Sequence, residues 1–408
     1  MALVVQKFGG TSVASIEHIE RVAKRIAGYR DRGDEVVVVV SAMGKETDRL
    51  DELAKSVGDS DADFRREVDV LLSTGEQVTA AVLSMVLTKI GYPAKSFTGG
   101  QVKILTDASH TKARILDIDT DNLRRELSQG TVPVVAGFQG VDSDQNITTL
   151  GRGGSDTTAV ALAVVLEAKE CQIYTDVEGV FTTDPRVVDV AQPLATVTFE
   201  EMLELASQGS RVLHTRAVEF ASKYKMPIRV LSSFSDAAGT LITNEESHNM
   251  EQPLISGIAF MKDEAQLMML GVKDIPGIAS RILGPISDAN IEVDMIVQNV
   301  AADKSTDFTF TVRREDYERA TAILESVAQE IGAREVTGDN KIAKLSIVGV
   351  GMKSHAGVAT KMFKVLSEES INIQMISTSE IKISVVIEEK YLELAVRALH
   401  TAFGLDAS

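Results

Sequence analysis

The C-terminal part of the 408-residue chain repeats itself at an offset of 80 residues, which limits the folds open to it. Chance similarity between two amphipathic units is the alternative, but glycines and the pair Ser287 and Ser367 also align. Repeats of this length are typical of duplicated domains packed against each other. Each copy predicts strand, glycine-containing turn, helix, strand, strand, helix, strand, a small α+β domain. The matching positions are Leu267 with Ile347, Leu270 with Val350, Gly271 with Gly351, Gly277 with Gly357, Ala279 with Ala359, Ile291 with Ile371, Val293 with Ile373, Met295 with Met375 and Ile296 with Ile376.

Strand-like runs alternate with helical ones through residue 231. The valine-rich run Glu35–Val40 is typical of a strand buried on both faces of a parallel sheet. The alternation predicts an α/β domain with helices on both faces of a mostly parallel sheet, and ligands at the carboxyl ends of the strands. A polar stretch at 244–252 is a candidate linker. Further strands are expected at 132–136, 171–174 and 228–231, and helices at 15–29, 64–88, 155–168 and 199–206.

Net charge, apolar content and the numbers of cysteines and histidines argue against several classes of function. The net charge of −17 argues against nucleic-acid or anionic-membrane partners, which favour a basic face. No apolar run approaches the roughly 20 residues that span a bilayer, and the N-terminus lacks the pattern of a signal peptide. The single cysteine, Cys171, fits a reducing compartment, so we expect a cytoplasmic protein. The six histidines show no metal-ligand spacing, and no metal-binding residue is predicted.

Glycines follow the first predicted strand in the segment Lys7-Phe8-Gly9-Gly10-Thr11-Ser12. Backbone N–H groups at such a turn can approach an anion closely, and a helix N-terminus adds a favourable dipole. Lys7 would supply a positive charge for a phosphate. A plain turn is the alternative, since neither GxxxxGK[ST] nor GxGxxG occurs in this chain.

Two later segments carry further polar groups. Residues 149–156, TLGRGGSD, carry backbone amides, a guanidinium group and a carboxylate just before a predicted helix, which suits ligand binding. The alternative is an ordinary helix start that is capped by Ser155 or Asp156. Residues 175–186, TDVEGVFTTDPR, are rich in hydroxyl and acidic groups suited to a nucleotide. Ser41 ends the valine strand. Glu76, taken alone, fits a solvated helix face better than a site.

Together these segments resemble the amino-acid kinase superfamily and, within it, the aspartate kinases. The motifs that carry the resemblance are KFGGTS at 7–12, VSAMG at 40–44, GRGGSD at 151–156 and TDVEGVFTTDPR at 175–186. The repeat resembles the paired ACT domains of that family. The resemblance implies a three-layer αβα kinase domain with a mostly parallel sheet at 1–245. Two ferredoxin-like ACT domains would follow at 250–335 and 340–408, with the strand at 254–262 available to pack with the second.

The implied activity is transfer of the γ-phosphoryl of MgATP to the side-chain carboxylate of L-aspartate, giving 4-phospho-L-aspartate. This is the entry step to lysine, threonine and methionine synthesis. Lys7 and Asp156 are the implied catalytic residues, and Mg²⁺ is expected through ATP oxygens. The implied ATP contacts are Lys7, Phe8, Gly9, Gly10, Thr175, Asp176, Phe181, Thr182, Thr183, Asp184, Pro185, Arg186 and Arg211, the last standing where many relatives have lysine. The implied aspartate contacts are Ser41, Thr47, Glu76, Arg152, Gly153, Gly154 and Ser155.

The resemblance also implies feedback inhibition by L-lysine, L-threonine or both. It leaves open a homo-oligomer or a heterotetramer with a regulatory subunit that starts near Met250, one of 13 methionines. Rival interpretations are another kinase of the superfamily, acting on acetylglutamate, glutamate or a nucleoside monophosphate, and a non-catalytic amino-acid sensor. The expected effector contacts are Asp274, Ile275, Pro276, Gly277, Ala279, Gln298, Asn372, Ile373, Ser379 and Glu380.

Overall fold

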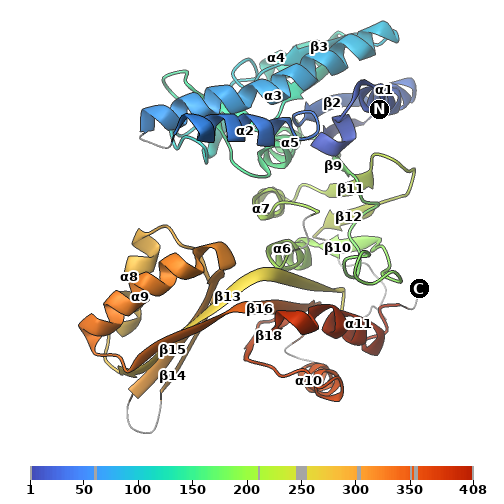
Figure 1. Cartoon of the computed structure of the whole chain (residues 1–408). Helices are drawn as coiled ribbons and strands as arrows, with labels where there is room; N and C mark the ends of the chain where they lie inside the picture. Colours follow the sequence, from blue (N-terminus) through green and yellow to red (C-terminus); the bar gives the residue numbers. More distant parts are fainter. Residues whose placement is uncertain are drawn as a thin grey trace. The chain divides into compact units, whose positions relative to one another are not determined.

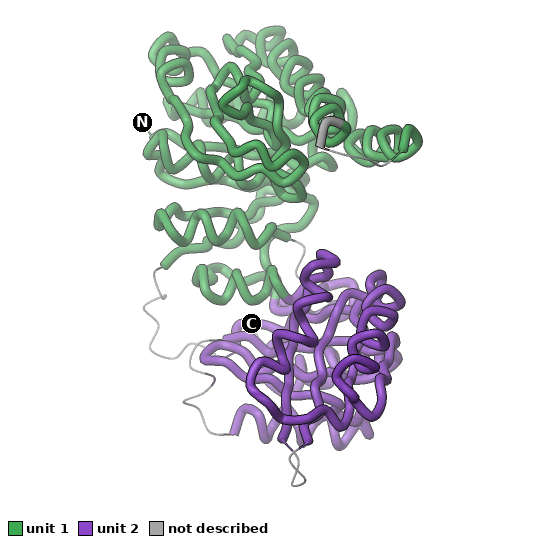
Figure 2. The backbone as a smooth tube through the Cα atoms, turned by 90° about the vertical axis from the view of Figure 1, so that its left-hand side faces the viewer, with its two compact units in different colours: residues 1–181, 193–207, 211–252 green, residues 182–192, 208–210, 253–408 purple. Residues whose placement is uncertain are grey.

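The computed structural model describes residues 2–58, 62–209, 212–244, 255–300, 305–349, 352 and 357–406. The chain folds as two compact units, which Figure 2 colours separately. Unit 1 holds residues 1–181, 193–207 and 211–252, and unit 2 holds 182–192, 208–210 and 253–408. Two short segments from the N-terminal part therefore belong to the C-terminal unit. The domain limits expected from the sequence stay a prediction.

A mostly parallel sheet forms the centre of unit 1 (Figure 1). Among the described residues its strand order is β10-β12-β11-β9-β1-β2-β6-β3, in which β11 and β12 pair antiparallel and the other neighbours pair parallel. The predicted α/β fold is confirmed. The strands are β1 Leu3–Phe8, β2 Glu35–Val40, β3 Ala94–Phe97, β6 Val132–Ala136, β9 Glu170–Thr175, β10 Thr196–Thr198, β11 Ile228–Ser232 and β12 Thr240–Thr243.

Helices pack on both faces of this sheet, as the run of buried valines in β2 requires. Val36, Val38 and Val40 lie in one core cluster with residues of α1 and α3. Alternate side chains of a strand point to opposite faces, and α5 packs on β1, β2 and β9 and against α7. The helices are α1 Ile16–Asp31, α2 Glu46–Val57, α3 Ala62–Lys89, α4 Asp121–Ser128, α5 Gly154–Val165, α6 Phe199–Ser207 and α7 Thr215–Tyr224.

A smaller sheet in unit 1 has the strand order β5-β4-β7-β8 within the described residues. Its last strand, β8, ends at Thr149, two residues before Gly151. This sheet therefore carries the chain into the glycine-rich segment that precedes α5. Its strands are β4 Ile104–Thr106, β5 Ile115–Ile118, β7 Gln139–Val141 and β8 Ile147–Thr149.

Unit 2 contains the repeat as one continuous sheet in the order β14-β15-β13-β16-β18-β17 among its described residues. Within its described residues the second copy does not end in a strand of its own, contrary to the sequence prediction. The N-terminal half of β13 takes that place, since Gly257–Met261 pairs with Lys344–Val348 of β16. The strands are β13 Gly257–Lys273, β14 Val293–Val300, β15 Ser305–Arg313, β16 Glu335–Val348, β17 Met375–Thr378 and β18 Lys382–Glu388.

Corresponding glycines begin corresponding helices in the two copies. Gly277 precedes α8 with φ +88°, and Gly357 precedes α10 with φ +108°. Both values lie in the left-handed region, which glycine adopts without the penalty of a Cβ atom. The repeat therefore extends to backbone conformation. The helices of unit 2 are α8 Ile278–Asp288, α9 Tyr317–Ile331, α10 Val358–Glu368 and α11 Leu392–Ala402.

Helix α3 contradicts the expectation that no apolar run is long enough to span a bilayer. Its residues Phe64–Lys89 are long and apolar enough to cross a bilayer by length and composition alone. Half of the apolar window is buried, and Leu83 and Leu87 pack in the core cluster against β2 and β6. The apolar content of α3 is thus explained by core packing in unit 1.

We predict that Leu83→Ala lowers the free energy of unfolding of unit 1 by about 2–5 kcal/mol, because it leaves a cavity beside the sheet. Leu83 is 0% exposed, whereas Met85 on the same helix is 70% exposed. Met85→Ala should change the same free energy by no more than about 0.5 kcal/mol. Urea denaturation followed by circular dichroism measures both, and equal losses would contradict this account of the core.

Candidate active site

The carboxyl ends of four parallel strands meet at one edge of the unit 1 sheet. Phe8 of β1 pairs with Val40 of β2 and with Tyr174 of β9, and Val40 pairs with Ala136 of β6. The segments that follow these residues therefore begin side by side. This edge is where an open α/β sheet binds its ligands.

Lys7 and Asp156 form an ion pair at this edge. Lys7 Nζ lies 2.6 Å from Asp156 Oδ1, and the two side chains are 12% and 11% exposed. Lys7 belongs to β1, and Asp156 lies in the first turn of α5, where a carboxylate also interacts favourably with the helix dipole. The structure thus brings together the two residues expected to be catalytic, 149 positions apart (156 − 7).

The glycine loop after β1 packs closely against the loop after β2. The Gly44 amide donates a hydrogen bond to the Gly10 carbonyl at 3.0 Å, and the Gly9 amide donates to the Tyr174 carbonyl at 3.1 Å. A Cβ atom on Gly10 would lie 2.9 Å from the Gly44 carbonyl oxygen, too close to be tolerated. On Gly9 it would lie 3.5 Å from Lys7 Nζ, so glycine leaves that ammonium group approachable.

Glu76 is buried, and the expectation of a solvated helix face is wrong. Its side chain on α3 is 3% exposed, and its Oε1 accepts a hydrogen bond from the Ala42 amide at 3.1 Å. Burial raises the pKa of Glu76 to about 7, although the backbone donors and the charge of Lys7 act in the opposite direction. Its Oε2 is buried without a hydrogen-bond partner among the described residues. Such a group is available to a polar ligand.

The segment before α5 is shaped by its glycines. Gly153 precedes the helix with φ +69° and no side-chain cap, so capping by Ser155 or Asp156 is wrong. A Cβ atom on Gly153 would lie 2.2 Å from His214 Cβ. Arg152 is exposed and forms no ion pair with any residue in the described ranges. Gly154 and Ser155 are buried at the start of α5.

Ser41 and Thr47 lie beside the same edge. The Ser41 amide donates to the Phe8 carbonyl at 3.1 Å, which fixes the backbone where β2 ends. Thr47 lies in the first turn of α2, and both side chains are half-buried. Their hydroxyl groups are close in sequence to Ala42 and Gly44, which contact Glu76 and Gly10.

The predicted nucleotide segment is divided between the units. Thr175, Asp176 and Phe181 belong to unit 1, whereas Thr182–Arg186 belongs to unit 2. There the Ile258 amide donates to the Thr182 carbonyl at 2.7 Å, and Thr182 Oγ1 lies 2.9 Å from His400 Nε2. Hydrogen bonds from Arg186 lower the pKa of Asp184. The ATP contacts in this segment stay a prediction, and Arg211 lies outside the described residues.

The expected effector contacts are mostly exposed. Residues 274–277 form the exposed turn before α8, and Ala279 is half-buried in its first turn. Gln298 is exposed on β14. Of the effector contacts expected in the second copy, Asn372 and Glu380 are exposed, and Ile373 and Ser379 are half-buried. Met250 and residues 353–356 lie outside the described part of the chain.

A hydroxyl pair that was not expected from the sequence supports the glycine loop. Ser233 Oγ donates to Ser12 Oγ at 2.6 Å, and the Ser233 amide donates to the Thr175 carbonyl at 2.8 Å. Ser233 follows β11, the next parallel strand beyond β9. Two serines directly after the predicted strand at 228–231 were the available signal, because that strand ends at the same edge of the sheet.

No group of three or more potential metal-ligating side chains occurs in the described ranges. The glycine loop instead lies beside the Lys7 ammonium group, 3.5 Å from where a Cβ atom on Gly9 would be. A positive charge of this kind can neutralise a phosphate, and any Mg²⁺ would then be held mainly by nucleotide oxygens.

Comparison with known proteins agrees with this geometry. Residues 2–232 match the amino acid kinase family, and residues 267–329 and 345–403 each match an ACT domain. The chain is 68% identical over 407 residues to an aspartate kinase of Pseudomonas fluorescens, which covers 100% of this chain and 98% of that protein. The chain belongs to the aspartate kinases.

Two solved structures are similar over nearly the whole length. E. coli aspartokinase III in complex with aspartate and ADP, in the R-state, is 26% identical with a TM-score of 0.81, covering 98% of this chain and 99% of that one. The same enzyme in complex with lysine and aspartate, in the T-state, gives a TM-score of 0.76 at the same identity and coverage. Aspartate kinases are thus similar to this chain in both units.

Glu76 predicts a pH dependence of stability. Its folded pKa of about 7 lies above its ordinary value of 4.5, so the folded chain binds the proton more tightly. This contribution to stability is fully present below pH 4.5 and is lost as the pH rises to about 7. The free energy of unfolding of the wild type, minus that of Glu76→Gln, should fall by about 3 kcal/mol over this range. Urea denaturation at several pH values measures it, and a difference independent of pH would contradict the assignment.

Proposed function

We infer that this chain transfers the γ-phosphoryl group of MgATP to the side-chain carboxylate of L-aspartate, giving 4-phospho-L-aspartate and ADP. The observation that carries this proposal is the Lys7–Asp156 ion pair beside the glycine loop at the carboxyl edge of the sheet. It is supported by the similarity to aspartate kinases along the whole chain. The reaction would begin the synthesis of lysine, threonine and methionine.

The chemistry needs charge stabilisation more than proton transfer. An aspartate side chain has a pKa of about 3.9, so the nucleophile is already ionised at neutral pH. A carboxylate oxygen forms a bond to the γ-phosphorus as the bond to the leaving ADP oxygen breaks. Lys7 would neutralise charge that spreads over the transferring group, with the Gly10 amide beside it, whereas the Gly9 amide is already bonded to the Tyr174 carbonyl. Asp156 would hold the Lys7 ammonium in place, a role supported by their 2.6 Å separation.

Aspartate would be held through its amino-acid groups. Arg152 carries a guanidinium group that is exposed and has no ion pair within the described residues, so it is available to a carboxylate. Glu76 would bind the substrate ammonium, and its unpartnered Oε2 supports this. Ser41, Thr47 and the Gly153–Ser155 segment would complete the contacts. Binding a cation favours the ionised form of Glu76, which reduces the cost of its burial.

Mg²⁺ bound to the nucleotide would neutralise negative charge on the phosphate oxygens. The residues of this chain that would contact ATP are Lys7, Phe8, Gly9, Gly10, Thr175, Asp176, residues 181–186 and Arg211. Another kinase of the superfamily would share the glycine loops, but the two ACT domains favour the aspartate kinases. A non-catalytic sensor would not need Lys7 and Asp156 together.

We further propose that L-lysine, L-threonine or both inhibit the enzyme at the turn before α8 and at the corresponding turn of the second copy. The amides at the start of α8, which the exposed residues 274–277 precede, could bind a carboxylate, and Gln298, Asn372 and Glu380 could select a side chain. A homo-oligomer, or a heterotetramer with a subunit starting near Met250, remains a proposal from the sequence. So does a cytoplasmic location.

We predict that Lys7→Ala lowers kcat at least about a hundredfold with little change in the KM for aspartate, since the contact acts in the transition state. Release of ADP is measured with MgATP against aspartate, acetylglutamate, glutamate and nucleoside monophosphates. Turnover with aspartate alone is expected of the wild type. Turnover with another acceptor, or near-normal turnover of the variant, would refute the proposal.

Ala279→Val should relieve inhibition by crowding the effector site, while activity without effector stays within about twofold of the wild type. The loss of inhibition would correspond to a coupling free energy of about 1–3 kcal/mol between the effector site and the active site. Ala359→Val makes the same change at the matching position on α10. Comparing the two variants shows which copy of the repeat is responsible for inhibition. Titration with lysine, with threonine and with both measures the effect. A wild type that neither amino acid inhibits at millimolar concentration would contradict the sensing role.

A further inference from the structure

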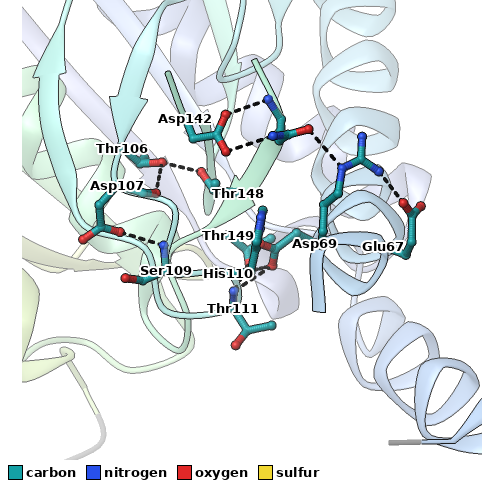
Figure 3. Close-up of polar contacts among 12 residues, drawn as sticks. Glu67, Asp69, Thr106, Asp107, Ser109, His110, Thr111, Asp142, Thr148 and Thr149 are labelled. Carbon is teal, nitrogen blue, oxygen red and sulfur yellow. Dashed lines mark hydrogen bonds and ion pairs between the residues drawn. The ribbon is translucent and has the colours of Figure 1, made fainter. Parts of the chain in front are cut away.

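Asp69 is a buried carboxylate that the phosphoryl-transfer account does not use. It lies on α3, is 0% exposed, and accepts hydrogen bonds on both of its oxygens. Thr149 Oγ1 donates at 2.5 Å, the Thr111 amide donates at 3.1 Å, and His110 Nδ1 lies 2.8 Å away. Figure 3 shows these partners converging on Asp69 from the loop after β4 and from the end of β8. A buried charge of this kind persists only because several donors surround it.

The partners of Asp69 lie next to the segment that carries Arg152. Thr149 is the last residue of β8, and its carbonyl accepts a hydrogen bond from the Ala113 amide at 2.9 Å. A Cβ atom on Gly151 would lie 3.1 Å from the Thr111 carbonyl oxygen. The loop at 109–113 and the segment at 149–151 are therefore in direct contact, and Asp69 joins both to α3.

Arg216 on α7 ties the same two segments together from another side. Its Nη1 donates to the Leu150 carbonyl at 2.6 Å, and its Nη2 donates to the Ala113 carbonyl at 2.7 Å. The backbone just before Gly151 and the neighbouring loop at 109–113 are thus held by charged groups from two helices. One of these groups, Asp69, reaches it through the Thr149 side chain and the Thr111 amide.

Arg152 itself has no comparable support. It is exposed and forms no ion pair within the described residues. It lies between Gly151 at φ +77° and Gly153 at φ +69°, two positions in the left-handed region that glycine alone adopts readily. Glycines allow this conformation but do not enforce it. The direction of the guanidinium group therefore depends on how firmly the flanking backbone is held.

We propose that Asp69 is a positioning residue for aspartate binding, which acts by fixing the Thr149–Gly151 backbone so that Arg152 is directed at the substrate carboxylate. This proposal rests on the proposed function, in which Arg152 binds that carboxylate. Asp69 and Glu76 lie seven positions apart, about two turns, on the same helix. Helix α3 then supports both charged groups that bind aspartate: it carries Glu76 directly and holds Arg152 through Asp69.

The chain offers a matched control in Asp142, a second buried carboxylate of the same region. It is 3% exposed and accepts hydrogen bonds from the amides of Asp144 and Asn146 at 2.9 and 2.8 Å and from Asn146 Nδ2 at 3.1 Å. These donors come from the turn between β7 and β8 and not from residues 109–113 or 149–151, although Asn146 Oδ1 in turn accepts a hydrogen bond from Arg66 Nε of α3 at 3.0 Å. Asp142 therefore tests the loss of a buried charge without loosening the Arg152 segment.

The test compares Asp69→Asn, Thr149→Val and Asp142→Asn in the full chain. A small displacement of a substrate-binding group can cost a hundredfold, so we expect Asp69→Asn to raise the KM for aspartate about tenfold to a hundredfold. Thr149→Val keeps the shape of the side chain and removes its donor, with an expected rise of about tenfold. The KM for ATP should stay within about twofold in both, and Asp142→Asn should leave both KM values unchanged within about twofold.

A double variant shows whether Asp69 acts through Arg152. If it does, Asp69→Asn in an Arg152→Ala background should raise the KM for aspartate no further than Arg152→Ala alone, because coupled residues are not additive. If the two substitutions instead multiply their effects on the KM for aspartate, the positioning role is wrong. A lower Tm with the aspartate KM unchanged, or equal rises in both KM values, would also overturn it, since these indicate a merely structural residue. Thr149→Val keeps the test available if Asp69→Asn fails to fold.

Measurements on the wild type show whether a failed test refutes the proposed function or only the positioning role of Asp69. A wild type without aspartate-dependent release of ADP refutes the proposed function, and the positioning role falls with it. A wild type with normal turnover, together with Asp69→Asn and Thr149→Val at the wild-type KM for aspartate, refutes the positioning role alone.

Discussion

The ion pair between Lys7 and Asp156 is the interaction on which the rest of the site depends. It joins the end of the first strand to the start of α5, two elements that the fold places in contact. An ammonium group that is 12% exposed loses much of its hydration, and a carboxylate at 2.6 Å offsets that cost. The pair therefore fixes one positive charge beside the Gly9 and Gly10 loop. The loop after β2, held by Gly44 and Glu76, closes against it.

Helix α3 gives the site its second support. Its apolar face packs against β2 and β6 with Leu83 and Leu87, which makes the helix a rigid part of the core. Its polar face carries Glu76 to the loop after β2 and Asp69 to the segment before Arg152. Burial of both carboxylates is costly. The fold tolerates Asp69 because a backbone amide, a hydroxyl group and a histidine surround it with donors. Glu76 accepts one hydrogen bond, from the Ala42 amide, and burial raises its pKa to about 7.

Much of this could be predicted from the sequence because it depends on local pattern. The valines of β2 predict their buried strand correctly, and the glycines after β1 and before α5 mark turns. The repeat at an offset of 80 residues predicts two similar copies, although the second lacks its expected last strand among the described residues. Long-range burial could not be predicted, since a glutamate in a helix looks solvated until a packed loop covers it, as at Glu76. The same holds for Asp69, whose partners lie 41 to 80 positions away. The segment Thr182–Gln192 belongs to unit 2 because of tertiary contacts, which no local sequence pattern predicts.

The most direct test of the account is a crystal structure of the full chain with MgADP, aspartate and a planar mimic of the transferring phosphoryl group. We predict Lys7 Nζ within hydrogen-bond distance of both Asp156 and the mimic, with the Gly10 amide directed at the mimic. Arg152 should contact a substrate carboxylate and Glu76 the substrate ammonium. A complex in which Lys7 turns away from the mimic, with aspartate bound elsewhere in the chain, would contradict the account.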